Sequence, residues 1–184
     1  MGKNRDAEVI TLGSGDLMIK EYTDDNFPAH TEFNVETDLL GRIQGGATLE
    51  YSGTWYDAKD DTGKAVKSII TEEEATLKSG IVTWNGKTLG KLVSTARVTD
   101  SAGLRTVKIG GTDNHNGKSY AICFHHHDPK DGDVWLTMRA VNQGGVSIAF
   151  TKDKETVIDA EFKALPMDTE GTLITYTEQI TTAG

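Results

Sequence analysis

Histidine and carboxylate side chains are concentrated in one stretch of this sequence. Three consecutive histidines occupy residues 125–127, and residues 128–133 add three aspartates. Imidazole and carboxylate groups are common ligands of transition-metal ions. Successive side chains of a strand point to opposite faces, however, so only His125 and His127 could bind the same ion. The pattern is more typical of a strand end followed by a turn. We predict no metal site, with His125 and His127 as the candidates should an ion bind.

The other acidic and nucleophilic residues do not form a recognisable catalytic pattern. Glu72, Glu73 and Glu74 could supply paired carboxylates, but strand alternation would divide them between two faces. No serine, histidine and acid have the local spacing of a hydrolase motif. Cys123 lies in an apolar run, where a buried and unreactive thiol is expected. We therefore expect no enzymatic activity and no cofactor.

The composition is acidic and moderately polar. The 184 residues carry a formal charge of −9, with a pI near 5.0, and 36% of them are hydrophobic. An acidic surface repels phosphate groups, which argues against a protein that grips nucleic acid. The single cysteine excludes a disulfide within the chain and favours synthesis in a reducing cytosol.

Neither an export signal nor a membrane segment is expected. The first five residues are polar, and no apolar signal region follows them. No apolar run reaches the roughly 20 residues that span a bilayer. We expect a soluble protein without membrane contact.

Two runs of alternating residues predict a long hairpin at residues 43–82. Apolar and polar side chains alternate over residues 43–56 and 65–82, with the period of two that marks a strand with one buried face. The segment 60–64, rich in aspartate and glycine, is a turn signal between them. A third strand of this kind is expected over residues 156–165. The apolar positions of the three runs are Ala47, Leu49, Tyr51, Trp55, Ile69, Ala75, Leu77, Ile81, Ile158, Ala160, Phe162 and Ala164.

Shorter elements are expected in the rest of the chain. Strand-like runs separated by glycine-rich breakers occur at Val9, Ile10 and Leu12, and at residues 17–19, 106–109, 120–124, 134–141, 146–150 and 173–176. Asn85 could cap the one predicted helix, whose apolar residues through Ala96 recur at helical spacing. Residues 23–42 show no periodicity and predict an extended arm or loop.

These elements predict a mainly β fold. We expect an antiparallel β-sandwich or barrel-like sheet with one flanking α-helix, in a single domain over residues 1–184.

Four segments, in order along most of the chain, carry a family resemblance. They are residues 6–15 (DAEVITLGSG), 40–51 (LGRIQGGATLEY), 70–86 (ITEEEATLKSG, continuing to TWNG) and 150–162 (FTKDKETVIDAEF). Together they resemble the tail tube (major tail) protein family of tailed bacteriophages and prophages of Gram-positive bacteria.

The resemblance implies a structural virion protein. In that family, six subunits form a ring whose sheets join into a β-barrel around a lumen, and stacked rings make the tail tube through which DNA is ejected into the host. The implied partners are further copies of the chain, a tape-measure protein, the tail terminator, baseplate or distal tail proteins, and genomic DNA that passes without specific binding. The implied locations are the virion tail and, during assembly, the host cytoplasm; the resemblance favours a non-contractile tail.

Specific residues follow from combining this resemblance with the strand alternation. The polar faces of the three alternating strands would line the lumen, with side chains Thr48, Glu50, Glu72, Glu74, Lys78, Asp159, Glu161 and Lys163. Candidates for contacts between stacked rings are Phe27, Phe33, Asp60 and Asp61. The alternative function is a carbohydrate- or metal-binding β-sandwich module, which would use His125 and His127 or exposed tryptophans.

Overall fold

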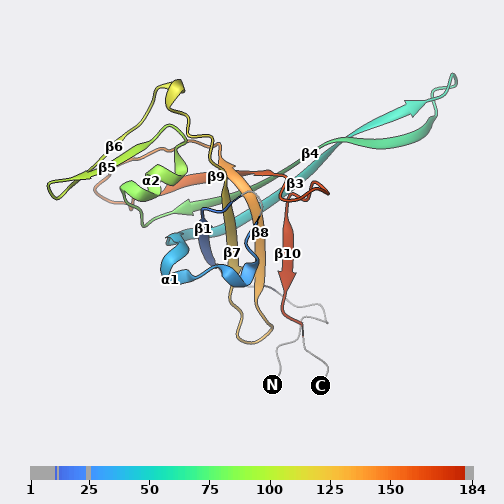
Figure 1. Ribbon diagram of the computed structural model, residues 1–184. Coiled ribbons are helices and arrows are strands. Elements are labelled where there is room, and N and C mark those ends of the chain that lie inside the picture. The colour runs from blue at the N-terminus through green and yellow to red at the C-terminus, as the bar shows by residue number, and fades with distance from the viewer. Residues whose placement is uncertain (1–10, 12, 24–25, 181–184) are drawn as a thin grey trace.

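The fold is mainly β and antiparallel, as predicted. The computed structural model describes residues 11, 13–23 and 26–180 (Figure 1). The predicted strand at Val9, Ile10 and Leu12 lies outside the described residues. Two α-helices and two 3-10 helices accompany the strands, and the sheets are not closed into a barrel. The helices are η1 (His30–Glu32), α1 (Val35–Asp38), α2 (Gly86–Leu92) and η2 (Thr112–Asn114). None of the described helices is long and apolar enough to cross a membrane.

Eight strands form the main sheet, in the order β2-β1-β7-β8-β9-β4-β3, with β10 also paired to β8. β5 and β6 form a separate two-stranded sheet. The strands are β1 (Asp16–Lys20), β2 (Leu39–Gly41), β3 (Ile43–Lys59), β4 (Ala65–Ile81), β5 (Arg97–Ser101), β6 (Leu104–Lys108), β7 (Tyr120–His126), β8 (Val134–Asn142), β9 (Ile158–Leu165) and β10 (Thr175–Glu178).

Strand β8 forms a corner between two halves of the main sheet. Along one edge it pairs with β10 over its first residues, Val134 to Thr137, and then with β9 from Arg139 to Asn142. The half containing β1, β7, β8 and β10 therefore runs across the direction of β9, β4 and β3 (Figure 1). This crossing gives the barrel-like shape, because the two inner faces enclose one core.

The chain connects the two ends of the sheet directly. β2 ends at Gly41 and β3 begins at Ile43, so only Arg42 lies between the two outermost strands. Arg42 is held by two hydrogen bonds, in which its N–H donates to Thr83 Oγ1 at 2.7 Å and its carbonyl accepts from Val82 N at 2.8 Å. The sheet is consequently wrapped around the core although it does not close.

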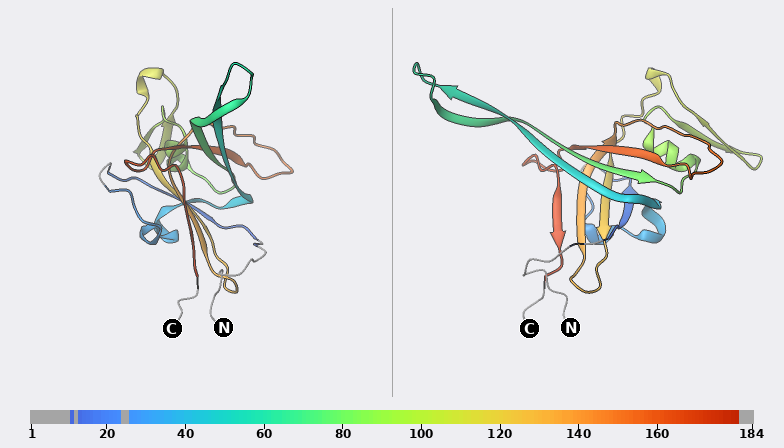
Figure 2. Two further views of the ribbon diagram at one scale, coloured as in Figure 1. Left: turned by 90° about the vertical axis from the view of Figure 1, so that its right-hand side faces the viewer. Right: turned by 180° about the vertical axis from the view of Figure 1, so that it is seen from behind.

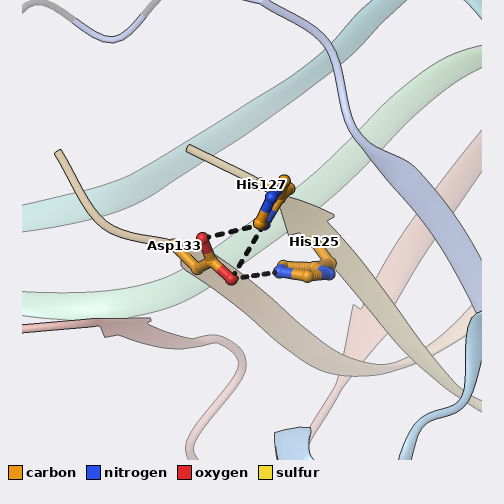
Figure 3. A group of neighbouring side chains, drawn as sticks. All are labelled: His125, His127 and Asp133. Carbon is orange, nitrogen blue, oxygen red and sulfur yellow. Dashed lines mark hydrogen bonds and ion pairs between the residues drawn. The ribbon is translucent and has the colours of Figure 1, made fainter. Parts of the chain in front are cut away.

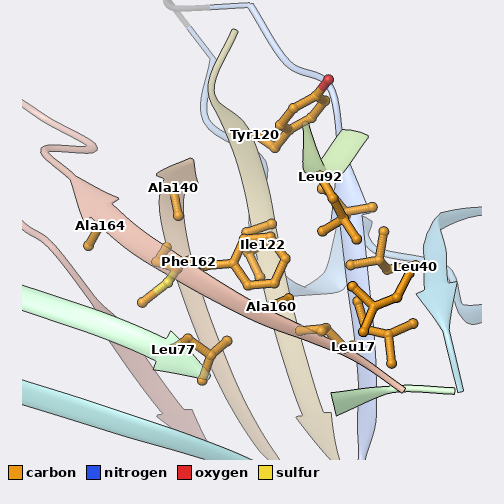
Figure 4. Packing of buried hydrophobic residues seen from close by; sticks show 14 of the residues in the cluster. Leu17, Leu40, Leu77, Leu92, Tyr120, Ile122, Ala140, Ala160, Phe162 and Ala164 are labelled. Atoms are coloured by element: carbon orange, nitrogen blue, oxygen red, sulfur yellow. The ribbon is translucent and has the colours of Figure 1, made fainter. Parts of the chain in front are cut away.

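The core lies between the crossed halves. Leu17 and Ile122 from the first half face Leu77 and Phe162 from the second, and all four are at most 1% exposed (Figure 4). Cys123 is also buried, and burial raises the pKa of its thiol to about 12. The burial of Cys123 is as the sequence predicted, and the raised pKa disfavours the reactive thiolate.

Helix α2 covers one end of the core. Asn85 caps it as predicted: its Oδ1 accepts from Lys87 N at 2.8 Å and from Thr88 N at 3.3 Å. The helix ends at Leu92, earlier than the sequence predicted, and buries Leu89 and Leu92. The β5–β6 sheet packs closely against it, since a Cβ added at Gly90 would lie 2.7 Å from Val98 Cγ2.

Three other expectations differ from the structure. Residues 146–150 do not form a strand: Val146 and Ile148 pack on the core, but the segment pairs with no described strand. Residues 23–42 contain η1, α1 and β2 in place of one irregular arm. Strand β5 was not predicted; its turn, Ala102-Gly103, adopts positive φ at both residues without the usual asparagine or aspartate signal.

The close passage of β2 beside residue 83 predicts that Gly41 does not tolerate a side chain. An alanine Cβ at this buried position would lie 2.1 Å from the backbone oxygen of Thr83. We expect Gly41→Ala to lower the free energy of unfolding by about 1–3 kcal/mol, the usual cost of overpacking. Chemical denaturation measures this change, and an unchanged midpoint would show that the two segments are less tightly apposed.

Candidate functional site

A polar face extends across β9, β4 and β3, on the side opposite the core. The register pairs Thr48 with Lys78 and Lys78 with Glu161, which places these three side chains in one cross-strand row. The neighbouring row joins Glu50 to Thr76 and Lys163 in the same way. The eight side chains proposed to line a lumen all belong to this face: Thr48, Glu50, Glu72, Glu74, Lys78, Asp159, Glu161 and Lys163. We call it the acidic face.

Two ion pairs partly offset the carboxylates of the acidic face. Lys78 Nζ lies 2.7 Å from Glu50 Oε2, and Lys163 Nζ lies 3.1 Å from Glu74 Oε2. The hydrogen bond to Glu50 raises the pKa of Lys78, with added attraction from Glu161. Five carboxylates against two ammonium groups leave the face with net negative charge.

The outer part of the β3–β4 hairpin projects from the body as a two-stranded ribbon (Figure 2). β9 pairs with β4 only from Thr76 to Ile81, so β3 and β4 have only each other beyond that point. Residues 59–74 of the ribbon are all exposed. β3 is also the last strand of the main sheet, so its outer edge pairs with no other described strand.

Apolar side chains are exposed on both faces of this ribbon. A β-bulge lies between Thr54 and Trp55, where Trp55 pairs with Ile70 and Tyr56 with Ile69. The prediction that Ile69 shares a face with Trp55 is therefore wrong. The bulge places Ile70 beside Trp55 and moves Ile69 to the opposite face of the ribbon. The large exposed hydrophobic residues of the ribbon, with their exposed fractions, are Tyr51 57%, Trp55 63%, Tyr56 59%, Val66 67%, Ile69 45% and Ile70 39%.

The residues proposed for ring stacking lie in two separate places. Phe27 and Phe33 belong to the segment that packs on the body, where both are half-buried and Phe27 contacts Tyr22 edge-on at 5.3 Å. Asp60 and Asp61 are at the tip of the ribbon. Asp60 Oδ1 accepts from Thr62 N at 2.9 Å and from Lys64 N at 3.0 Å, so this side chain shapes the turn. The large exposed apolar side chains described above therefore lie on the ribbon, whereas Phe27 and Phe33 are half-buried on the body.

The histidines at the end of β7 are divided between two directions, as alternation predicted. His126 turns toward Ser14, whose carbonyl oxygen lies 2.7 Å from its Nδ1. His125 and His127 converge on Asp133 (Figure 3). His125 Nε2 is 3.1 Å from Asp133 Oδ2, and His127 Nδ1 is 3.0 Å from Asp133 Oδ1.

Asp133 was not assigned to this cluster from the sequence. It directly precedes β8, and the pairing of His126 with Val134 brings it back beside the end of β7. The short connection between β7 and β8 could have predicted this contact. In an antiparallel pair joined by a short turn, the start of the second strand lies beside the end of the first. Burial raises the pKa of Asp133, but hydrogen bonds from His127, His125 and the Asp128 N–H outweigh it and lower that pKa to about 2.

Comparison with known proteins identifies no family. No protein-family model matches the sequence, and no curated protein matches it. Among solved structures, one similar chain comes from the virion of a native gene transfer agent (GTA) particle. It is 9% identical with a TM-score of 0.42, and the matched region covers 88% of this chain and 95% of that chain.

Adjacent residues of β4 should respond very differently to substitution. Lys78 and Glu50 are exposed partners on the acidic face, whereas Leu77 is buried beneath it. Exposed ion pairs contribute little to stability, so we expect Glu50→Gln with Lys78→Gln to leave the melting temperature unchanged. Leu77→Ala should lower the free energy of unfolding by about 2–5 kcal/mol because it leaves a cavity. Thermal and chemical denaturation measure both; equal effects would contradict the two-sided strand.

Proposed function

We propose that this chain is a structural subunit of a phage tail tube. It assembles with further copies into six-membered rings, the rings stack, and the acidic faces surround the channel through which genomic DNA leaves the virion. The observation that carries the proposal is the projecting ribbon, with its exposed apolar side chains and the unpaired edge of β3. The four resembling segments support the same function.

The ribbon supports self-assembly because its two strands pair with no third strand among the described residues. A two-stranded hairpin alone is marginally stable in water, and a third strand or a packed layer is normally required. Soluble monomers also rarely expose a large contiguous apolar patch. Packing against a neighbouring copy would bury Trp55, Ile70 and their neighbours and supply the missing layer.

The unpaired edge of β3 supports closure of a sheet between copies. An exposed edge strand offers free N–H and C=O groups, and joining edges into a closed barrel removes them. β9, β4 and β3 would then continue from subunit to subunit. Their apolar side is already covered by the core, so the acidic face is the side available to line a channel.

A negative channel wall is suited to the passage of DNA. Phosphates are repelled by the five carboxylates that each subunit contributes, so the cargo would not adhere. In physiological salt the screening length is about 8 Å, which limits the repulsion to a thin layer at the wall. Tape-measure protein, terminator and distal tail proteins are the further partners in this proposal.

Electron microscopy of the purified full chain tests the proposal. Negative-stain images and mass photometry should reveal rings or tubes, and a reconstruction should place Glu50, Glu161 and Asp159 at a shared channel. A stable monomer that binds a sugar would favour the alternative binding module. Rings whose channel is basic, or whose acidic faces point outward, would contradict passage of DNA along this face.

Charged substitutions on the ribbon should abolish assembly without unfolding the body. Trp55→Asp and Ile70→Asp each place a carboxylate in the proposed contact, where burying an unpaired charge is costly. We expect only monomers by mass photometry, with an unchanged circular dichroism spectrum. Leu104→Asp is the matched control, because Leu104 is 72% exposed on the β5–β6 hairpin. Normal tubes from both ribbon variants would exclude the ribbon as the assembly contact.

Charge reversal on the acidic face should convert a channel that does not bind DNA into one that retains it. Glu50→Lys with Glu161→Lys changes the formal charge by +4 in each subunit and removes neither core nor ribbon contacts. Co-sedimentation of assembled tubes with short duplex DNA should show retention that falls as salt rises. Wild-type tubes should retain none, and strong retention by the wild type would contradict a non-adhesive channel.

A further inference from the structure

The cluster of His125, His127 and Asp133 lies away from the acidic face and the ribbon. It occupies the ends of β7 and β8 that are joined by their turn, and this turn lies far from the ribbon (Figure 1). One ligand-type atom from each of the three side chains falls within 4.8 Å of the other two. Two imidazoles and one carboxylate are a set of donors found in zinc sites.

We propose that His125, His127 and Asp133 form a binding site for one divalent transition-metal ion per chain, with zinc as the best-suited ion. His125 Nε2, His127 Nδ1 and one Asp133 carboxylate oxygen supply three ligands. The fourth position of a tetrahedral site is open to water. The site holds the β7–β8 turn and does not depend on the proposed tail tube function.

The distances are close to those that a zinc ion requires. Zinc bonds of about 2.0–2.1 Å at tetrahedral angles place neighbouring ligand atoms about 3.3 Å apart. Asp133 Oδ2 lies 3.1 Å from His125 Nε2 and 3.2 Å from His127 Nδ1, and both distances are already near this value. The third pair of ligand atoms, His125 Nε2 and His127 Nδ1, lies within 4.8 Å, and the 62% exposed His127 side chain has room to rotate closer when an ion binds.

Two of the three ligands are held in place by neighbouring groups. The His125 ring stacks on Trp135 with an interplanar angle of 7° and a centroid distance of 5.0 Å, and His30 packs on the same indole at 4.8 Å. Asp133 accepts the Asp128 N–H at 3.1 Å. Its backbone carbonyl accepts the Gln179 N–H at 2.9 Å. Ligands fixed in this way lose little freedom when an ion binds.

The donor set also selects the class of ion. Imidazole nitrogens favour zinc, nickel, cobalt and copper, whereas magnesium and calcium prefer sites made of oxygen ligands. A millimolar excess of magnesium should therefore not displace zinc.

Isothermal titration calorimetry of the tag-free full chain with zinc chloride tests the site. We expect one ion per chain, undisturbed by excess magnesium. His127→Ala should weaken binding at least about tenfold. His115→Ala is the matched control, because it removes an exposed histidine from a distant loop, and it should bind zinc as the wild type does. Cobalt(II) should give the intense visible absorption of a tetrahedral ion in the wild type and not in His127→Ala.

Thermal denaturation gives an independent readout. At a hundredfold excess over Kd, zinc should raise the melting temperature of the wild type by about 5–10 °C and that of His127→Ala by much less. Without zinc, His127→Ala should melt slightly below the wild type because Asp133 loses one hydrogen-bond partner, so the quantity compared is the shift that zinc causes in each protein. The proposal is overturned if the wild type neither binds zinc nor melts at a higher temperature with it. Undiminished binding by His127→Ala, or displacement by magnesium, overturns it equally.

Discussion

The alternation of side chains along β9, β4 and β3 is the constraint on which the rest of the structure depends. Leu77 and Phe162 point into the core, while their chain neighbours Lys78 and Glu161 point to the acidic face. A register slip of one residue would bury the charges and expose the core, so the core itself enforces the register. Burial of the core side chains when one chain folds therefore also places the charged side chains together on the opposite face.

The body of the chain has its own hydrophobic core, whereas the projecting ribbon consists of two strands without a core. The body wraps its sheet around one core, aided by the single-residue link at Arg42 and by the corner in β8. The ribbon continues the same two strands beyond the reach of β9, and its bulge distributes apolar residues to both faces. This division places the stability of the monomer and the proposed capacity to assemble in different segments, so substitutions can affect one without the other.

The β7–β8 turn brings the side chains of His125, His127 and Asp133 together at the end of the body remote from the ribbon. Hydrogen bonds from two histidines and a backbone N–H hold the pKa of Asp133 below its usual range although burial raises it. Buried carboxylates require such partners, since an unpaired charge in a protein interior is costly. The same arrangement that satisfies Asp133 gathers the donors of the proposed metal site.

Local pattern and tertiary contact determined different parts of this protein. The sequence alone predicted the bounds of the long hairpin to within a few residues, the two faces of its inner part, the Asn85 cap and the mainly β class. These depend on periodicity and on neighbours a few residues away. It did not predict that residues 146–150 remain unpaired, that β8 divides its edge between β9 and β10, or that Asp133 joins His125 and His127. Each of these features depends on which segments lie side by side in the folded sheet. The alternation of apolar and polar residues within one strand does not indicate which strand pairs with it.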